Sequence, residues 1–274
     1  GAWTAELYRS HSYVAVWERF QEKDVTDTIF KYPCNISVLQ RATGVIVHSA
    51  YSIELTKQWY EDRFGDDWWT IPLLRTPANK KDRIEARKTL GLAPDDFVVC
   101  SFGILSSTKR NHRLLRAWLN SKLAEDPRCQ LIFVGENGGG DYGKQLLDTI
   151  RQSGPRDRIH ITGWVKTETF KHYLAAADMA VQLRTHSRGE TSAAILDCMN
   201  YGLPVVVNAN GSIAELPQDA VWMLPDDFKD ADLIEALEVL RDDVKRCKKL
   251  GARAREVIHT RHAPRACADQ YARA

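Results

Sequence analysis

The chain lacks the two features that most often place a protein in a membrane or on nucleic acid. None of its hydrophobic runs approaches the ~20 residues that cross a bilayer. Its formal net charge is only +2, which is too small for a strongly basic field. The first residues carry neither a basic start nor an apolar segment, so they do not resemble a signal peptide. These absences predict a globular protein that binds no nucleic acid.

Cysteine is scarce, and the six cysteines that occur are scattered. They form no C-x-x-C pair and have no spacing with histidine that a zinc site would require, so we expect neither a metal nor another cofactor. Most of them lie beside apolar residues, which is typical of reduced, buried thiols and favours a cytoplasmic protein. The cysteines are Cys34, Cys100, Cys129, Cys198, Cys247 and Cys267.

From residue 96 onward, apolar segments of strand length alternate with helical patterns. This alternation predicts a parallel sheet with helices on both faces, which is an α/β, Rossmann-like, doubly wound fold. Several of the segments are apolar throughout, as strands buried on both faces are. The predicted strands are 97–101, 130–135, 158–162, 179–183, 204–208 and 220–224; the predicted helices are 111–123, 142–152, 168–177 and 191–201, with a short turn at 212–216.

The first third of the chain follows a different pattern and carries five of the eight tryptophans. Its two predicted strands are too few for a complete domain, so we expect a partial α/β domain there. A polar segment with a proline, residues 76–82, is the candidate linker. The predicted elements outside the central region are helices at 35–42, 53–63, 231–240, 243–259 and 264–274 and strands at 44–48 and 69–74.

The loop after the first central strand runs from Phe102 to Asn111 and has the composition of a phosphate site. Gly103 allows a close approach of the backbone to a ligand, and Lys109 and Arg110 carry charge that would neutralise phosphates. The loop is neither a P-loop nor a G-x-G-x-x-G fingerprint, so the kinase and dehydrogenase interpretations lose their main support. The alternative is an ordinary strand-to-helix loop with surface cations.

A second strand-end turn, Gly163-Trp164-Val165, would expose backbone groups to the edge of a flat base, with Trp164 stacked nearby. The alternative is a tryptophan that caps the core.

The segment Arg188-Gly-Glu-Thr-Ser-Ala-Ala-Ile-Leu-Asp197 places two carboxylates, Glu190 and Asp197, on either side of a helix start. Backbone N–H groups at such a start form an anion site, and a carboxylate one to two turns later suits sugar hydroxyls. Together they suit a ligand with a diphosphate and a ribose, that is, a nucleotide sugar. The alternative is a pair of solvated acids, of which Asp197 is favoured by the helix dipole. Glu215, after the next strand, is interpreted as a cap or an acceptor-side acid.

These segments, in their order, resemble the retaining glycosyltransferases of the GT-B fold, family 4-like, described as glycosyl transferases group 1. The resemblance covers residues 35–274 and is strongest over 95–225. The segments that carry it are Val45-Ile-Val-His-Ser49, Gly103-Ile-Leu-Ser-Ser-Thr-Lys109, Leu131-Ile-Phe-Val-Gly135, Ile161-Thr-Gly-Trp-Val165 and Glu190 through Pro204, whose counterpart in the family is an E-x7-E region followed by G-x-P.

The resemblance implies a role for each matching residue. Lys109 would hold the donor diphosphate with the backbone amides of Thr191, Ser192 and Ala193, and Glu190 would contact the donor sugar. The remaining donor-site residues are Asp197 for the ribose, the turn Gly163, Trp164 and Val165 for the base, and Gly103 and Arg110 in the phosphate loop. The catalytic residues would be Glu190 and Lys109.

The chain departs from the family pattern at two positions. Ile104 stands where the family has an arginine, and Arg110 is the expected substitute. Six residues, not seven, separate Glu190 from Asp197, and the second acid is an aspartate.

The implied reaction transfers a sugar from a nucleotide diphosphate, UDP or GDP, to a glycan or lipid-linked acceptor with retention, in lipopolysaccharide, capsule or polysaccharide biosynthesis. Residues 1–78 would be the remnant of the acceptor-side domain, 79–258 the nucleotide-sugar domain, and 259–274 a helix packing back on the N-terminal part. We therefore expect a piece of a longer protein that binds donor and transfers sugar poorly by itself. The alternatives are a nucleotide-sugar epimerase and a non-catalytic scaffold. The basic last helices predict a solvated face, or else a peripheral contact with the inner face of the cytoplasmic membrane.

Overall fold

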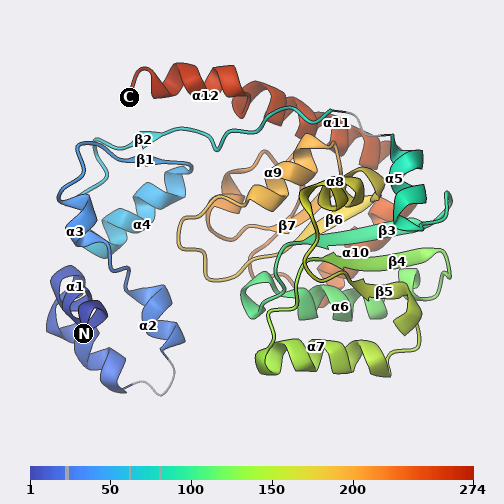
Figure 1. The fold of residues 1–274 in the computed structure, drawn as a ribbon, viewed down its shortest axis with the longest axis horizontal. Coiled ribbons are helices and arrows are strands. Elements are labelled where there is room, and N and C mark those ends of the chain that lie inside the picture. The colour runs from blue at the N-terminus through green and yellow to red at the C-terminus, as the bar shows by residue number, and fades with distance from the viewer. Residues whose placement is uncertain (22–24, 62, 80–81) are drawn as a thin grey trace.

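A six-stranded parallel sheet forms the centre of the larger part of the molecule in the computed structural model, which describes residues 1–21, 25–61, 63–79 and 82–274 (Figure 1). The strand order is β5-β4-β3-β6-β7-β8, so the chain moves outward from β3 in one direction and then from β6 in the other. This is the doubly wound, Rossmann-like order that the alternating pattern predicted. The strands are β3 (Phe97–Phe102), β4 (Cys129–Val134), β5 (Ile159–Ile161), β6 (Met179–Gln182), β7 (Val205–Asn208) and β8 (Trp222–Leu224).

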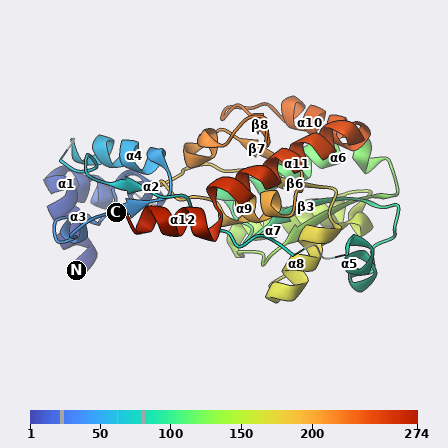
Figure 2. The same cartoon turned by 90° about the horizontal axis from the view of Figure 1, so that it is seen from above.

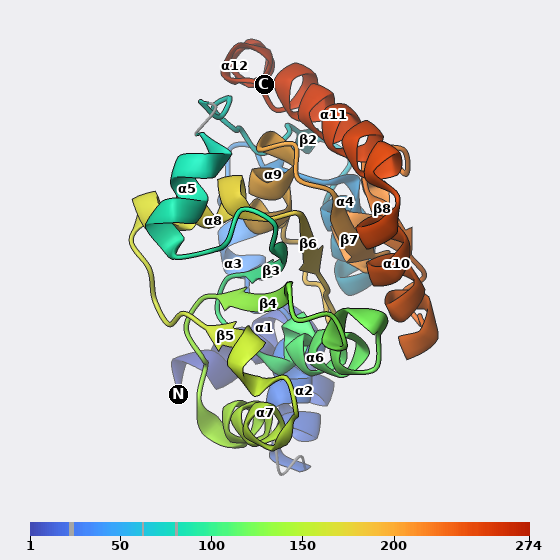
Figure 3. The same cartoon turned by 90° about the vertical axis from the view of Figure 1, so that its right-hand side faces the viewer.

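Each face of the sheet is covered by its own set of helices. Side chains of β3 alternate between the two faces, so Val99 joins one apolar cluster and Val98 and Cys100 join the other. Burial on both faces explains why these strands are apolar throughout. The first cluster includes side chains of α6 (Asn111–Leu119), α7 (Gly140–Gln152) and α10 (Asp230–Asp242), the second includes side chains of α8 (Thr167–Ala176) and α9 (Ala193–Asn200), and α11 (Val244–Arg261) contributes to both. Figure 3 shows α6 and α7 on one side of the sheet and α8 and α9 on the other.

The N-terminal part is mostly helical and contains one small parallel sheet of β1 (Ile46–Val47) and β2 (Trp69–Thr70). Both predicted strands exist there, but they are only two residues long. The helices are α1 (Ala2–Gln21), α2 (Thr26–Lys31), α3 (Ile36–Leu39) and α4 (Ala50–Tyr60). The sequence analysis did not predict α1, because Ser12, with φ of 63°, breaks it and its apolar residues follow no clear helical period.

The C-terminal helices return to the N-terminal part. The backbone N–H of Arg75 donates to the His262 carbonyl, and His262 Nδ1 lies 2.9 Å from the Leu73 carbonyl oxygen. In α12 (Pro264–Tyr271), the Cys267 thiol donates to the Pro72 carbonyl oxygen at 3.3 Å. Figure 2 shows α12 beside the N-terminal elements. Of the predicted linker 76–82, Lys80 and Lys81 lie outside the described residues, and α5 (Arg83–Leu90) follows it.

One helix boundary matters for the site. Helix α9 begins at Ala193, two residues later than predicted. The Thr191 hydroxyl donates to the His48 carbonyl, and the Ser212 hydroxyl donates to the Glu190 carbonyl. These bonds hold residues 190–191 outside helical geometry, so Ser192 becomes the N-cap.

Candidate functional site

The candidate site lies between β3 and β6, where the strand order reverses. In doubly wound sheets, ligands bind outside the carboxyl ends of the strands at this crevice. The loop after β3 and the loop after β6 meet there, since the backbone N–H of Thr185 donates to the Thr108 carbonyl at 2.9 Å. The amide of Asn208, at the end of β7, accepts from the Arg184 N–H and donates to the Arg184 carbonyl, at 2.7 and 2.8 Å.

Lys109 occupies this crevice. It ends a 3₁₀ turn, Ser107–Lys109, and its ammonium group lies against Gly103, where a Cβ would come within 2.2 Å of Nζ. Gly103 has φ of +99°, a conformation that other residues rarely adopt. Burial, with a smaller contribution from the like charge of Arg184, lowers the pKa of Lys109 to about 8. Two of the three residues predicted for the phosphate loop, Gly103 and Lys109, therefore lie against each other.

Arg184 is the residue that the sequence analysis missed. Burial lowers the pKa of its guanidinium, and the charge of Glu190 opposes that shift. Within the described part of the chain, neither Arg184 nor Lys109 forms a side-chain hydrogen bond or ion pair. Cations that are partly buried without a carboxylate partner are unfavourable, so these two indicate an anion site. The position of Arg184 directly after the predicted strand 179–183 was the sequence signal that could have identified it.

The start of α9 contributes unoccupied backbone donors at the same edge of the sheet. Ser192 is its N-cap, and the Ser192 side chain makes no cap hydrogen bond to the first turn. The orphan N–H groups of a helix start attract anions, as predicted for Thr191, Ser192 and Ala193. Glu190 stands in the preceding loop, and its carboxylate accepts from the Arg188 N–H at 2.7 Å.

Asp197 lies one turn further along α9, and its partner, Arg75, comes from outside the crevice loops. Its carboxylate forms an ion pair with Arg75, with Oδ1 2.9 Å from Nε. Burial raises the pKa of Asp197, and Arg75 partly offsets this effect. Both residues line a cavity of about 590 Å³ between α8, α9 and residues 75–79. The sequence analysis assigned no role to Arg75, since no local pattern links it to α9.

The turn after β5 begins at Gly163. Gly163 has φ of +70°, and the Thr162 hydroxyl donates to its carbonyl and accepts from the Gly135 N–H. The Trp164 side chain is 74% exposed, while Val165 packs partly against the core. The alternative of a tryptophan that caps the core is therefore wrong, and the ring is open to solvent.

Arg110, the expected substitute for the missing arginine, points to another neighbour. Its Nη1 donates to the Asp226 carbonyl at 3.2 Å, and its guanidinium carbon lies 5.5 Å from the centre of the Phe228 ring. Ile104 is 59% exposed. The contacts of Arg110 are thus with the segment before α10, whereas the contact of Lys109 is with Gly103.

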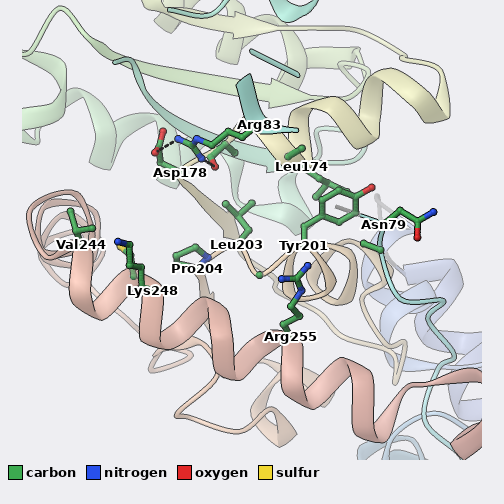
Figure 4. A pocket seen from close by; sticks show the side chains of 15 residues that line it. Asn79, Arg83, Leu174, Asp178, Tyr201, Leu203, Pro204, Val244, Lys248 and Arg255 are labelled. Carbon is green, nitrogen blue, oxygen red and sulfur yellow. Dashed lines mark hydrogen bonds and ion pairs between the residues drawn. The ribbon is translucent and has the colours of Figure 1, made fainter. Parts of the chain in front are cut away.

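A second cavity, of about 390 Å³, lies at the opposite edge of the sheet. It is lined by residues before β6 and β7, including Asp178 and Pro204, and by Lys248 and Arg255 of α11 (Figure 4). Its ion pair between Arg83 and Asp178 is satisfied within the protein. Because it lies at the amino ends of the strands, it does not belong to the crevice.

Neither a metal site nor a membrane-spanning helix is found in the residues that the structure describes. Among these, no three His, Cys, Asp or Glu side chains gather as a metal site would require. No helix in the described ranges has both the length and the apolar character of a membrane span.

Comparison with known proteins identifies one matching family, several related sequences and several solved structures with a similar fold. The family model described as "Glycosyl transferases group 1" matches residues 82–257. The lipopolysaccharide core biosynthesis glycosyltransferase LpsD of Rhizobium meliloti (strain 1021) is 28% identical over 187 residues, which are 68% of this chain and 51% of that protein. The chain thus spans about half the length of this curated relative.

Two solved structures share the fold. The structure of Anabaena HepE in complex with UDP and glucose superimposes with a TM-score of 0.75 at 22% identity, over 86% of this chain and 64% of that chain. Sucrose-phosphate synthase from Thermosynechococcus elongatus gives a TM-score of 0.76 at 21% identity, over 99% of this chain and 64% of that chain.

Proposed function

Because the chain belongs to the glycosyl transferases group 1 family, whose fold is GT-B, we propose that it binds a nucleotide-diphosphate sugar in the crevice between β3 and β6. The full reaction that we propose moves the sugar to a hydroxyl of a glycan or glycolipid with retention. The bond from the anomeric carbon to the phosphate oxygen breaks, the acceptor oxygen bonds to that carbon, and the acceptor proton leaves with the diphosphate.

One observation carries this proposal: Lys109 lies partly buried at the crevice without a carboxylate partner among the described residues, at the edge of the sheet where α9 also starts. A cation and helix N–H groups fixed in a partly dry site stabilise negative charge far better than water-exposed groups do. The charge that develops during the reaction is on the departing diphosphate. The site therefore supplies stabilisation where sugar transfer requires it.

The remaining roles follow the family pattern residue by residue and are part of the proposal. The N–H groups of Thr191, Ser192 and Ala193 bind the diphosphate, and Glu190 contacts the donor sugar. The open ring of Trp164 and the backbone of Gly163 and Val165 receive the base. Asp197 binds the ribose hydroxyls, which requires that its ion pair with Arg75 open or share the carboxylate.

The class of acceptor that we propose is inferred from a related protein, LpsD. LpsD acts in lipopolysaccharide core biosynthesis, which supports an acceptor from surface polysaccharide or glycolipid assembly for this chain. HepE was solved with UDP and with UDP-glucose, which makes uridine nucleotides the first ligands to test.

The test is calorimetric titration of the chain with UDP, GDP and their glucose conjugates. We expect one saturable site for the diphosphate of one base, and a rise in melting temperature with that ligand. At 100 times the dissociation constant, the ligand adds about 2.7 kcal/mol of stability. If none of these ligands binds or raises the melting temperature, the chain is a scaffold that kept the fold, and the proposal is wrong.

A further inference from the structure

We propose that Arg184 is a second diphosphate-binding cation of this protein and that it acts as a pair with Lys109. The inference rests on the proposed function, because the anion that it assigns is the diphosphate of the donor. Nothing in the resemblance assigned a role to this residue. Four observations support this assignment. They are the anchored backbone of Arg184, the charges of Arg184 and Lys109, the hydrogen-bonding geometry of a guanidinium group, and a nearby buried amide without a partner.

The backbone of Arg184 is fixed from two sides. Both of its peptide groups are held by the side chain of Asn208, which is itself fully buried and also donates to the Asp226 carboxylate. The next residue, Thr185, is bonded to Thr108 across the crevice. Arg184 and Lys109 are thus each next to one end of the same interloop hydrogen bond. This arrangement places their side chains at one edge of the sheet without relying on a flexible loop.

Among the described residues, no ion pair neutralises the charge of Lys109 or of Arg184. Lys109 and Arg184 repel each other and are both partly removed from water, and in the described ranges neither pairs with a carboxylate. The charge of Glu190 acts on Arg184, but the two form no ion pair; the Glu190 carboxylate accepts from the Arg188 N–H. Removal of two like charges from water without a partner is unfavourable, so the arrangement is stabilised when a dianion enters.

The chemistry of arginine suits this position. A guanidinium presents N–H donors in a planar fork that matches two phosphate oxygens, whereas an ammonium acts as a point charge. With Lys109 on the same diphosphate, each phosphoryl group has a cation. The two cations together neutralise the negative charge that grows when the sugar departs.

An unsatisfied buried amide supports the same position. Gln182 is only 6% exposed, and its Nε2 has no partner among the described residues. It stands two residues before Arg184, at the carboxyl end of β6. Because side chains two apart in a strand share a face, Gln182 lies on the face of Ala180, which packs with α9. Buried amides without partners are rare, so this donor fits a site that is completed by a ligand.

The experiment compares affinities for whichever nucleoside diphosphate the unaltered chain binds, with inorganic pyrophosphate as a second probe. Arg184→Gln should weaken the binding of both probes about 10–100-fold, the range for a lost charge-assisted hydrogen bond. Arg184→Lys should lie between Arg184→Gln and the unaltered chain, because it keeps the charge and loses the fork. Lys248→Gln, which removes an exposed cation in the cavity at the opposite edge, should bind as the unaltered chain does.

A pH profile separates a direct role from a structural one. The affinity of the unaltered chain for the diphosphate should fall above about pH 8, as Lys109 loses its proton. Removal of Arg184 takes away the like charge that acts on Lys109, so the fall should move to higher pH in Arg184→Gln. Comparison of the two proteins cancels the titration of the ligand itself. A variant that merely perturbed the fold would lose affinity without this shift.

The outcomes are distinct. If the unaltered chain binds neither nucleoside diphosphate, the proposed function fails and the role of Arg184, which rests on it, is refuted with it. If it binds one and Arg184→Gln binds equally well with an unchanged pH profile, the role of Arg184 is refuted while the function stands. If Arg110→Gln costs more affinity than Arg184→Gln, the second cation is Arg110 and the pairing proposed here is wrong.

Discussion

Gly103 leaves free the space that the Lys109 ammonium group fills, so a single methyl group there disturbs the site. In Gly103→Ala, the new Cβ would lie 2.2 Å from Lys109 Nζ on a backbone with φ of +99°. We expect a loss of stability of about 1–3 kcal/mol from backbone strain, and at least tenfold weaker binding of the nucleoside diphosphate. Urea unfolding and calorimetry measure the two effects. Gly154→Ala is the matched control, since nothing lies within 4 Å of its Cβ position; equal affinities for both variants would contradict the arrangement.

Lys109 should reduce the stability of the ligand-free protein. Its pKa in the folded state is about 8, below the unfolded value, so between these values the unfolded chain binds more protons and stability rises with pH. At pH 7 the cost of keeping the buried ammonium charged is fully present. Lys109→Met should therefore raise the free energy of unfolding by roughly 2–3 kcal/mol and abolish diphosphate binding. Equal stability of variant and parent at pH 7 would show that the ammonium group is well solvated.

At the scale of elements, one carboxylate joins α5 and the segment before β6 to the start of β3. Asp178 accepts from the Val98 N–H and from both Arg83 and Arg87. Arg87 is 3% exposed, and its guanidinium also donates to the carbonyls of Ala93, Pro94, Asp96 and Ala176. Burial lowers the pKa of Arg87, and the charge of Asp178 opposes this change. Arg83, by contrast, is nearly half exposed.

These two arginines give a matched comparison on one carboxylate. Arg87→Met should cost about 3–5 kcal/mol of unfolding free energy, because it strands Asp178 and several buried carbonyls. Arg83→Met should cost about 0–1 kcal/mol, since an exposed ion pair is screened by water. Denaturant unfolding of both variants provides the measurement. Similar losses for the two would mean that the contacts of Arg87 add little beyond the ion pair.

The start of α9 shows how far an element can be placed from sequence alone. Its apolar period predicted a helix, and the helix exists. Its first two predicted residues are not helical, because Thr191 and the Glu190 carbonyl bond to His48 and Ser212. These partners belong to distant segments, so local propensity could not identify them.

At the scale of the whole molecule, the N-terminal part meets the crevice loops through α4. The Glu215 carboxylate accepts from the N–H groups of Ala50 and Tyr51, at the start of that helix. The hydroxyls of Ser49 and Ser52 donate to the Gly189 carbonyl. Of the two interpretations of Glu215, the structure therefore places it as a cap, on a helix of the other part.

Loss of this cap should loosen the contact between the two parts. Glu215→Ala leaves the N–H groups of Ala50 and Tyr51 without their acceptor, while the Ser49 hydroxyl still caps Ser52 N–H; the loss costs about 1 kcal/mol and removes a favourable charge at the helix dipole. Amide hydrogen exchange should accelerate in α4 and in residues 186–190, while β3 and β4 keep their protection. Glu54→Ala, on the same helix, is the control. Unchanged exchange in α4 would show that the cap does not couple the two parts.

From residue 97 onward the sequence by itself determined the order of strands and helices, because burial on one or two faces leaves a pattern within each segment. It also placed Lys109, Gly163 and the start of α9 at strand ends, and in a parallel sheet all carboxyl ends share one edge. Only the tertiary structure decided which side chains meet there. The loop of Arg184 meets the loop of Lys109 through the Thr185–Thr108 hydrogen bond, and Arg75 pairs with Asp197, because β6 is inserted next to β3 and residue 75 lies against α9. These two contacts join residues 77 (185 − 108) and 122 (197 − 75) positions apart, and no local periodicity encodes them.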